Sequence, residues 1–509
     1  METTTLSTST DDSEIPDRSE DRARTDLGFI IVWSASEPHR VGEIALFTSE
    51  KDVYVLGRGN EPRGEDRRQR VTFFRQRPGA VTLAGPLEAP RISRDQLEVR
   101  REVDGESREN AVLVVKNVGR CRLVREGDEN DVTETRVRPG EWLELRGQLL
   151  LMCVERLAWV RQSPELRGYP SFDFGAPDAH GIVGESHEAW RMREVVAFVA
   201  RRAGHVLVRG ESGTGKELVA RALHALSDRQ KRAMVSRNAA TLPEGLIDAE
   251  LFGNARNYPN AGMEARTGLV GEAHESTLFL DEFAELPASL QAHLLRVLDA
   301  GEYTRLGEPR PRRADFRLIA ATNRPLSALK QDVLARLPFR VELAGLPARR
   351  EDIPLLLRHV LQRIHASDPE AVTRFMEGEA ARVSVDLVKA LLRHPYTTHA
   401  RELETLVWQS VISSTGDRLE TPEAWHAQFG SPRAEASPSE TGEAAASSFD
   451  GVDSANRSDG ALTPARIQAC LDAHNGVIEH AWGPLGLSSR HALARLIRKH
   501  RLQLRRSPK

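Results

Sequence analysis

The chain has 509 residues, which at about 150 residues per domain predicts three or four domains. Its 71 Lys and Arg nearly balance 74 Asp and Glu, a net charge of −3, which excludes a uniformly basic nucleic-acid coat but not a basic patch at one end. No apolar run approaches the roughly 18 residues of a membrane span, so we expect no membrane association. A polar, acidic start and three widely spaced cysteines predict a cytoplasmic protein without disulfides or a Cys-based zinc site.

The N-terminal part of the chain divides into a tail, a β-rich segment and a linker. Residues 1–26 are acidic, rich in Ser and Thr and nearly free of apolar residues, which predicts disorder. From 27 to 160 short runs such as G-F-I-I-V-W and A-V-L-V-V alternate with turn signals, which is typical of an all-β sandwich. Residues 161–179 contain Pro and Gly and are predicted to be a linker.

Two short motifs in the β-rich segment predict a phosphate site. V-L-G-R-G contains Arg58, and R-I-S-R-D contains Ser93 and Arg94; these groups can donate charge-assisted hydrogen bonds to a phosphate dianion. The pattern resembles the forkhead-associated (FHA) domain, a β-sandwich whose loops hold phosphothreonine. The resemblance implies that a phosphothreonine protein or a Ser/Thr kinase is a partner. Gln96 stands where that family has a His, and the family's Asn falls near Cys121; the alternative is a sandwich with surface arginines.

The central and C-terminal parts of the chain have different patterns. From 180 to 346 apolar strand runs alternate with helical patterns, which predicts an α/β domain with a parallel sheet and helices on both faces. Residues 347–430 are predicted to be wholly helical. Residues 431–461 are of low complexity and predicted to be flexible, and 462–509 regain helical periodicity.

A Gly-rich loop in the α/β segment predicts a nucleotide site. It lies between the strand run H-V-L-V-R and the helical run E-L-V-A-R-A-L-H, so backbone N–H groups and a helix N-terminus can surround a polyphosphate. Lys216 would reach the β- and γ-phosphates of ATP. The alternative is a Gly-rich turn in an unrelated α/β protein. The expected nucleotide-binding residues are Gly210, Glu211, Ser212, Gly213, Thr214, Gly215, Lys216 and Glu217.

Two later strand runs end in polar residues suited to the same site. T-L-F-L-D-E places Asp281, which can organise Mg2+ through the nucleotide, beside Glu282, which can polarise water. F-R-L-I-A-A-T-N-R ends in Asn323, whose amide could sense the γ-phosphate; taken alone, this Asn is more typical of a turn.

Four motifs together (G-E-S-G-T-G-K-E, T-L-F-L-D-E, L-I-A-A-T-N-R and A-R-E-L-E) resemble the AAA+ domain of bacterial enhancer-binding proteins, the sigma-54 activators. The resemblance covers about 180–430 and implies a ring-forming, hexameric ATPase with a helical lid, which uses ATP and Mg2+ as cofactors. It implies that Asn238 restrains the catalytic Glu, that Arg336 acts on a neighbour's nucleotide, and that Arg401 senses nucleotide from the lid. Lys330 replaces the family's first trans-acting Arg, which predicts some loss of turnover.

The loop with which that family touches sigma-54 is altered here. Residues 250–253 keep E-L-F-G, but the six positions that hold Gly-Ala-Phe-Thr-Gly-Ala in the family read 257–262 N-Y-P-N-A-G. Pro259 replaces the Phe and Asn260 the Thr, which removes an aromatic contact and a backbone donor. We therefore expect weak or absent sigma-54 activation, unless Tyr258 supplies the aromatic contact one position away.

The C-terminal 462–509 resembles a Fis-type helix-turn-helix, which implies DNA binding. From 485 to 509 there are eight Lys or Arg and no Asp or Glu, the local charge that phosphate contacts require. The expected contacts are Ser489, Arg490, His491 and Arg495. Trp482-Gly483-Pro484 must shorten or kink the first helix, and a solvated basic tail is the alternative.

The leading hypothesis is a cytoplasmic transcriptional regulator that binds DNA, hydrolyses ATP at ring interfaces and receives a phosphoprotein signal. One rival is an ATP-dependent DNA-binding regulator or scaffold that does not remodel sigma-54 RNA polymerase holoenzyme. A second rival is a degenerate ATPase that serves as a nucleotide-gated oligomeriser.

Overall fold

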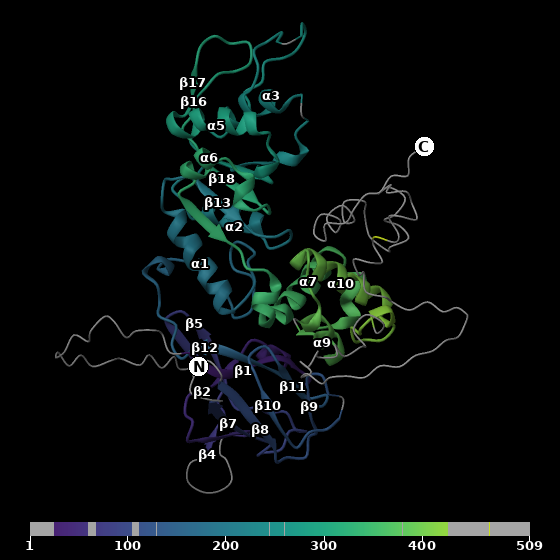
Figure 1. Cartoon of the computed structure of the whole chain (residues 1–509). Helices are drawn as coiled ribbons and strands as arrows, with labels where there is room; N and C mark the ends of the chain where they lie inside the picture. Colours follow the sequence, from purple (N-terminus) through teal and green to yellow (C-terminus); the bar gives the residue numbers. More distant parts are fainter. Residues whose placement is uncertain are drawn as a thin grey trace, which may run out of the picture. The chain divides into compact units, whose positions relative to one another are not determined.

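The computed structural model describes residues 25–59, 68–103, 111–128, 130–243, 245–258, 260–378, 380–425 and 468. The chain forms two compact units, Met1–Arg433 and Ala434–Lys509. All helices and strands named below belong to the first unit (Figure 1). The predicted DNA-contacting residues Ser489, Arg490, His491 and Arg495 lie outside the described residues.

The N-terminal region is a two-sheet β structure, which confirms the β-rich prediction. In the described part of the region, a seven-stranded sheet has the order β6-β5-β2-β1-β12-β11-β9, and a five-stranded sheet has the order β10-β8-β7-β3-β4. The strands are β1 Thr25–Ser34, β2 Ile44–Phe47, β3 Val53–Leu56, β4 Arg68–Arg70, β5 Phe74–Arg77, β6 Ala80–Leu83, β7 Leu97–Val103, β8 Ala111–Asn117, β9 Leu123–Arg125, β10 Glu134–Val137, β11 Trp142–Leu145 and β12 Leu149–Leu157.

The central strand β1 is buried on both faces. Phe29 and Ile31 pack into the core between the two sheets, whereas Ile30 and Val32 pack into a second core shared with the helical lid. This burial explains why the strand reads as a continuous apolar run instead of alternating with polar residues. The strand also corrects the boundary of the predicted disordered tail 1–26. Asp26 lies within β1, where its buried carboxylate pairs with Arg101 at 2.5 Å.

The segment 161–179, predicted to be a linker, packs against both of its neighbours. Arg77 of the sandwich donates to the carbonyl oxygen of Phe172 at 2.7 Å and pairs with Glu185 at 2.5 Å. Asp178 pairs with Arg193 at 2.9 Å, and both of these side chains are fully buried. Burying charges costs free energy unless they are paired, so these contacts fix the path of the segment.

The central region is an α/β domain with a parallel sheet, as predicted. Within the described chain its five strands have the order β14-β15-β18-β13-β19, and all their pairings are parallel. Alternate residues of β18 enter different cores: Leu318 packs with the α3–α6 side and Ile319 with the α1–α2 side. Helices therefore cover both faces of the sheet. The elements are α1 His187–Ala200, β13 Val206–Arg209, α2 Lys216–Ala225, β14 Val235–Asn238, α3 Ile247–Phe252, α4 Leu269–Glu272, β15 Thr277–Asp281, α5 Ala288–Ala300, β16 Glu302–Tyr303, β17 Arg312–Arg313, β18 Arg317–Thr322, α6 Gln331–Arg336 and β19 Phe339–Glu342.

The lid is mostly helical but contains a small hairpin that the wholly helical prediction missed. Strands β20 Met376–Glu377 and β21 Ala380–Ala381 pair around Gly378, whose φ of +61° favours glycine. The helices of the lid are α7 Ile353–Ser367, α8 Pro369–Val372, α9 Val385–Arg393 and α10 His399–Ser413. In the described part of the first unit, the 3-10 helices are η1 Pro38–Arg40, η3 Pro164–Leu166, η4 Ala239–Thr241, η5 Phe283–Glu285, η6 Leu326–Ala328, η7 Leu346–Asp352 and η8 Thr373–Phe375. Among the described residues, none of the helices combines the length and the apolar character that crossing a membrane requires.

Candidate functional site

The Gly-rich loop lies between β13 and α2, as its sequence predicts. Gly213 and Gly215 have φ values of +77° and +99°, a region that side chains with a Cβ rarely adopt. Lys216 is buried, and its Nζ donates to the carbonyl oxygens of Gly210 at 3.0 Å and Glu211 at 3.1 Å. A Gly-rich turn with an inward lysine at the N-terminus of a ten-residue helix fits a polyphosphate.

Two carboxylates lie at the carboxyl end of β15. The backbone N–H of Glu282 donates to Asp281 Oδ1 at 2.9 Å, and Glu282 itself has a φ of +49°. Burial, with the nearby charges of Asp281 and Glu285, raises the pKa of Glu282 against the opposing effect of Lys216. A raised pKa suits a group that accepts a proton near neutral pH. An uncommon backbone conformation at this residue is consistent with a functional position.

The two predicted asparagines lie at the same edge of the sheet. Asn238 ends β14 in register with Asp281, and its Oδ1 accepts the N–H of Ala240 at 2.9 Å. Asn323 is exposed and follows β18 directly. The loop is joined to this edge, because the N–H of Gly210 donates to the carbonyl oxygen of Thr322 at 3.2 Å. Parallel strands thus bring four separate motifs to one edge.

The first turn of the lid helix α10 lies directly on the Gly-rich loop. Arg401 Nη1 donates to Ser212 Oγ at 3.0 Å, and the N–H of Ala400 donates to the carbonyl oxygen of Gly213 at 3.1 Å. The approach requires glycine, since a Cβ on Gly213 would lie 2.0 Å from the carbonyl oxygen of Thr398. The structure therefore brings the predicted sensing residue Arg401 to the predicted nucleotide loop.

The sequence did not predict a functional role for His399. Its buried ring lies between Glu211, with Nε2 and Oε2 2.9 Å apart, and the N–H of Leu346, which donates to Nδ1 at 3.4 Å. His399 also has a φ of +48°. The sequence signal was the run Y-T-T-H at 396–399, where the sigma-54 activators that this segment resembles have an aromatic residue followed by Pro-Gly-Asn; it gave no indication of the partner of His399. His399 thus connects the loop, the lid and the segment between them.

Glu402 fixes the turn from which α10 starts. Its carboxylate accepts the N–H groups of Thr397 at 2.7 Å and Thr398 at 2.9 Å, and lies 2.6 Å from His394 Nε2. Burial alone raises the pKa of Glu402, but these hydrogen bonds lower it to about 2. The charged carboxylate therefore holds Thr398 and the following residues where they meet the loop.

We expect the stability contribution of Glu402 to disappear in acid. Because its folded pKa lies below the unfolded value of about 4.3, the stabilisation is complete above that pH and is lost as pH falls toward 2. Thermal melts should show Glu402→Gln less stable than the wild type near neutral pH, with the difference shrinking on acidification. The control is Glu404→Gln. Glu404 lies on α10, like Glu402, and the substitution removes its ion pair with Arg363 of α7. A difference that does not change with pH would contradict the expectation.

The predicted trans-acting Arg336 lies at the end of α6. Its side chain contacts Asp299 and not the Gly-rich loop of its own chain. Its Nε donates to Asp299 Oδ1 at 2.8 Å and Nη2 to Oδ2 at 3.2 Å, and these bonds lower the pKa of Asp299. Lys330 is exposed immediately before α6. Glu217, in the first turn of α2, pairs with Arg221 at 2.6 Å.

The structure also brings together the predicted phosphate residues of the sandwich. The N–H of Arg58 donates to the carbonyl oxygen of Ser93 at 3.0 Å. This contact requires Gly57, because a Cβ there would lie 1.9 Å from the carbonyl oxygen of Arg94. Ser93 Oγ accepts the N–H of Arg120 at 3.0 Å, and the Arg94 side chain is exposed.

Gln96, at the position where the FHA resemblance predicts a His, is fully buried and organises these loops. Its Oε1 accepts the N–H of Ser93 at 3.1 Å and of Cys121 at 3.3 Å. Its Nε2 donates to Asn117 Oδ1 at 2.7 Å and to the carbonyl oxygen of Cys121 at 2.8 Å. Gln96 therefore orders the Ser93 loop, whereas the sequence offered no partner for it.

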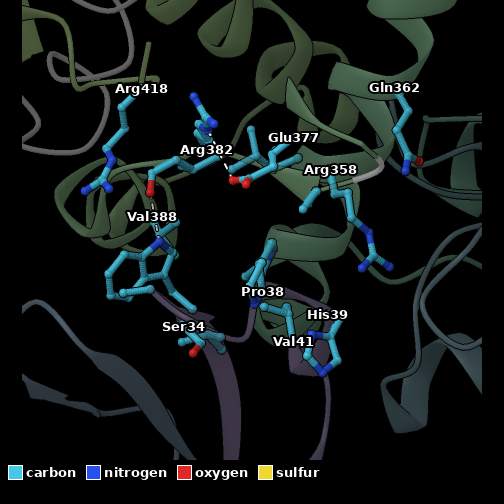
Figure 2. Close-up of a pocket in the computed structure, with 18 of the residues that line it drawn as sticks. Ser34, Pro38, His39, Val41, Arg358, Gln362, Glu377, Arg382, Val388 and Arg418 are labelled. Atoms are coloured by element: carbon cyan, nitrogen blue, oxygen red, sulfur yellow. Dashed lines mark hydrogen bonds and ion pairs between the residues drawn. The ribbon is translucent and has the colours of Figure 1, made fainter. Parts of the chain in front are cut away.

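The sandwich packs against the lid through the outer face of its larger sheet. Trp33 Nε1 donates to the carbonyl oxygen of Val383 at 2.9 Å, and Arg156 pairs with Glu351 at 2.5 Å. A cavity of about 470 Å³ lies in this junction. Figure 2 shows Pro38 and Val41 of the sandwich facing Arg382 of the lid across it. The lid thus contacts both the sandwich and the Gly-rich loop.

Comparisons with known proteins agree with the central site. Residues 182–345 match the family described as Sigma-54 interaction domain. The Nif-specific regulatory protein of Bradyrhizobium diazoefficiens is 38% identical over 264 residues, covering 50% of this chain and 43% of that protein. The transcriptional regulatory protein ZraR of Escherichia coli K12 is 38% identical over 246 residues, covering 47% and 54%. The central region is therefore similar to that of transcriptional regulators with a sigma-54 interaction domain.

The similarity does not extend over whole proteins. This chain spans about half the length of those two relatives. Among solved structures, NtrX from Brucella abortus in complex with ATP is 28% identical with a TM-score of 0.42, over 62% of this chain and 68% of that chain.

Proposed function

We propose that the protein is an ATP-hydrolysing, DNA-binding transcriptional regulator of the sigma-54-dependent enhancer-binding family, assembled as a hexameric ring and controlled through its N-terminal sandwich. The observation that carries the proposal is the meeting of the Gly-rich loop, the Asp281–Glu282 edge and Arg401 at one place. The similarity of 182–345 to the sigma-54 interaction domain supports it.

In this proposal each residue of the site has a separate role in ATP hydrolysis. The loop amides and Lys216 bind the phosphates, and Asp281 holds Mg2+ through the nucleotide; the ion would offset the phosphate charge. Glu282 accepts the proton of the attacking water, which its raised pKa favours. Arg401 reports nucleotide to the lid, and Arg336 serves the site of a neighbouring subunit.

For the sandwich we propose phosphothreonine recognition by Arg58, Ser93 and Arg94. Arg58→Ala and Ser93→Ala should each weaken binding of a degenerate phosphothreonine peptide library about tenfold or more, because hydrogen bonds to a charged group are lost. Isothermal titration against the phosphorylated and unphosphorylated libraries measures the effect. Arg100→Ala, an exposed arginine on β7, is the matched control. Equal affinity for the two libraries would remove this role.

The lid offers a physical connection between the sandwich and the nucleotide site. Its core is shared with the outer face of the sandwich sheet, and its helix α10 meets the Gly-rich loop. A phosphopeptide that shifts the sandwich would therefore act on Arg401 through packed elements. This arrangement supports control of ATP turnover by the sandwich.

A second candidate function follows from the altered loop at 257–262. In this second candidate, the protein is an ATP-dependent DNA-binding regulator or scaffold that does not remodel sigma-54 holoenzyme. The reason is that Pro259 and Asn260 stand where the family has the Phe and Thr that contact sigma-54. Within either candidate, DNA binding is assigned to 462–509 on the sequence alone.

In vitro transcription with sigma-54 and with housekeeping holoenzyme, with and without ATP, separates the two candidates. The altered loop favours the second candidate in this assay, so we expect little or no ATP-dependent open-complex formation by the unmodified protein. Replacing 257–262 with Gly-Ala-Phe-Thr-Gly-Ala should create or strengthen it. Activation by the unmodified protein that is lost in Tyr258→Ala would overturn this expectation.

A further inference from the structure

Two loops of the α/β domain are joined into one surface. The first loop is 253–268, which follows α3, and the second is 304–311, between β16 and β17 (Figure 1). The N–H of Leu306 donates to the carbonyl oxygen of Gly253 at 3.0 Å, and the N–H of Ala255 donates to that of Leu306 at 2.8 Å. The loops therefore present their side chains as a unit.

A buried amide holds the first loop in shape. Asn254 is fully buried, and its Nδ2 lies within donor range of the carbonyl oxygens of Ala255 at 2.9 Å, Glu264 at 3.0 Å and Tyr258 at 3.2 Å. The N–H of Gly262 donates to Asn257 Oδ1 at 2.9 Å. This internal bonding reduces the ordering cost of binding a partner.

Tyr258 is an aromatic side chain displayed on the joined loops. Its ring lies against Gly307, where a Cβ would be 2.5 Å from the ring carbon Cγ, and Gly307 has a φ of +79°. Although the ring packs against Gly307, the Tyr258 side chain remains 43% exposed. A large ring that is held in place yet open to solvent can stack on a planar partner.

The charge around Tyr258 is positive. Between them, 255–266 and 302–313 carry six arginines and three glutamates. Arg312 pairs with Glu308 at 2.8 Å, whereas Arg256 and Arg310 are exposed, and neither of their side chains forms a hydrogen bond or an ion pair with another of the described residues. Arg256, two residues before Tyr258, and Arg310, on the loop against which the Tyr258 ring packs, are therefore available to an anionic partner.

We propose that these joined loops bind single-stranded nucleic acid, with Arg256 and Arg310 contacting phosphates and Tyr258 stacking on a base. An exposed aromatic ring among arginines is the arrangement that binds single strands without sequence preference. An acidic polypeptide would satisfy the arginines but leave the tyrosine face without a planar partner. The site is separate from the duplex-binding role proposed for 462–509, and it does not depend on ATP hydrolysis.

The test uses the full-length protein and a short fluorescent oligothymidylate carrying 5-iododeoxyuridine. Excess unlabelled duplex DNA is present, so that the proposed C-terminal site is occupied. Ultraviolet crosslinking followed by mass spectrometry should locate the strand on the peptide containing Tyr258. Tyr258→Ala should weaken binding about fivefold or more, and Tyr258→Phe should retain it, since stacking survives.

Arg256→Ser combined with Arg310→Ser should weaken binding and lower the salt dependence, by a slope of about 0.7 per lost phosphate contact. The control is Arg91→Ser combined with Arg100→Ser on the sandwich, which should change neither. Absence of a crosslink on 253–268, or affinity unchanged in Tyr258→Ala, would overturn the proposal. Equal displacement of the strand by polyglutamate would also overturn it, in favour of an acidic protein partner. ATPase activity and duplex binding, measured on the same proteins, report separately on the proposed function.

Discussion

Glu282→Gln is expected to bind ATP normally and to hydrolyse it about 10²–10⁴ times more slowly than the wild type, the usual contribution of a general base. The substitution keeps the size and the hydrogen-bonding capacity of the side chain but removes the proton acceptor. The pKa of Glu282 is raised by burial and by its acidic neighbours, so the wild-type rate should increase with pH as the carboxylate loses its proton. A phosphate-release assay measures the rate, and a fluorescent ATP analogue measures binding.

Two comparisons give this result its meaning. Lys216→Ala should lose nucleotide binding, because the ammonium group at the loop is removed, and so it distinguishes a binding defect from a chemical one. Glu285→Gln removes a nearby carboxylate that pairs with Arg324 at 2.7 Å and is placed outside the proposed chemistry. Turnover by Glu282→Gln at the wild-type rate would exclude Glu282 as the base.

Arg336→Ala is expected to lower ATP turnover about 10³-fold or more, the range for an arginine supplied to a phosphoryl-transfer site. In its own chain Arg336 pairs with Asp299. The pair lies at the protein surface, where a neighbouring subunit can reach Arg336. Activity per subunit of the wild type should therefore rise with protein concentration. Asp299→Asn removes the ion pair within the chain. Turnover should be preserved if this pair only positions Arg336 and takes no part in the reaction.

Mixing two inactive variants tests the assignment between subunits. An Arg336→Ala subunit retains Glu282 in its own site, and a Glu282→Gln subunit retains Arg336 for its neighbour. Mixed assemblies should therefore regain part of the wild-type activity, whereas neither variant does so alone. No recovery in assemblies shown to be mixed, or turnover independent of concentration down to the monomer, would contradict an interfacial site.

The placement of polar groups at the sheet edge could be predicted from the sequence because it depends on local order. A buried strand followed by Gly210–Lys216, and another followed by Asp281 and Glu282, place polar groups where strands end. Parallel strands in one sheet then bring these ends to a single edge, whatever the details of packing. Arg58 and Ser93 follow the same logic in the sandwich, since each is fixed by a short motif at a strand or loop end. Their roles in binding stay predictions.

What only the tertiary structure decided are the contacts between residues far apart in the chain. Three such contacts join segments that no local sequence pattern relates: His399 with Glu211, Gln96 with its hydrogen-bond partners, and the Tyr258 ring with Gly307. The shared core of the sandwich and the lid also explains the outward-facing Ile30 and Val32, which the sequence showed as part of an apolar run without indicating what covers it. Local order sets which groups a segment can offer, whereas packing of the whole unit sets which of them meet, because burial and hydrogen bonding are satisfied over the entire core at once.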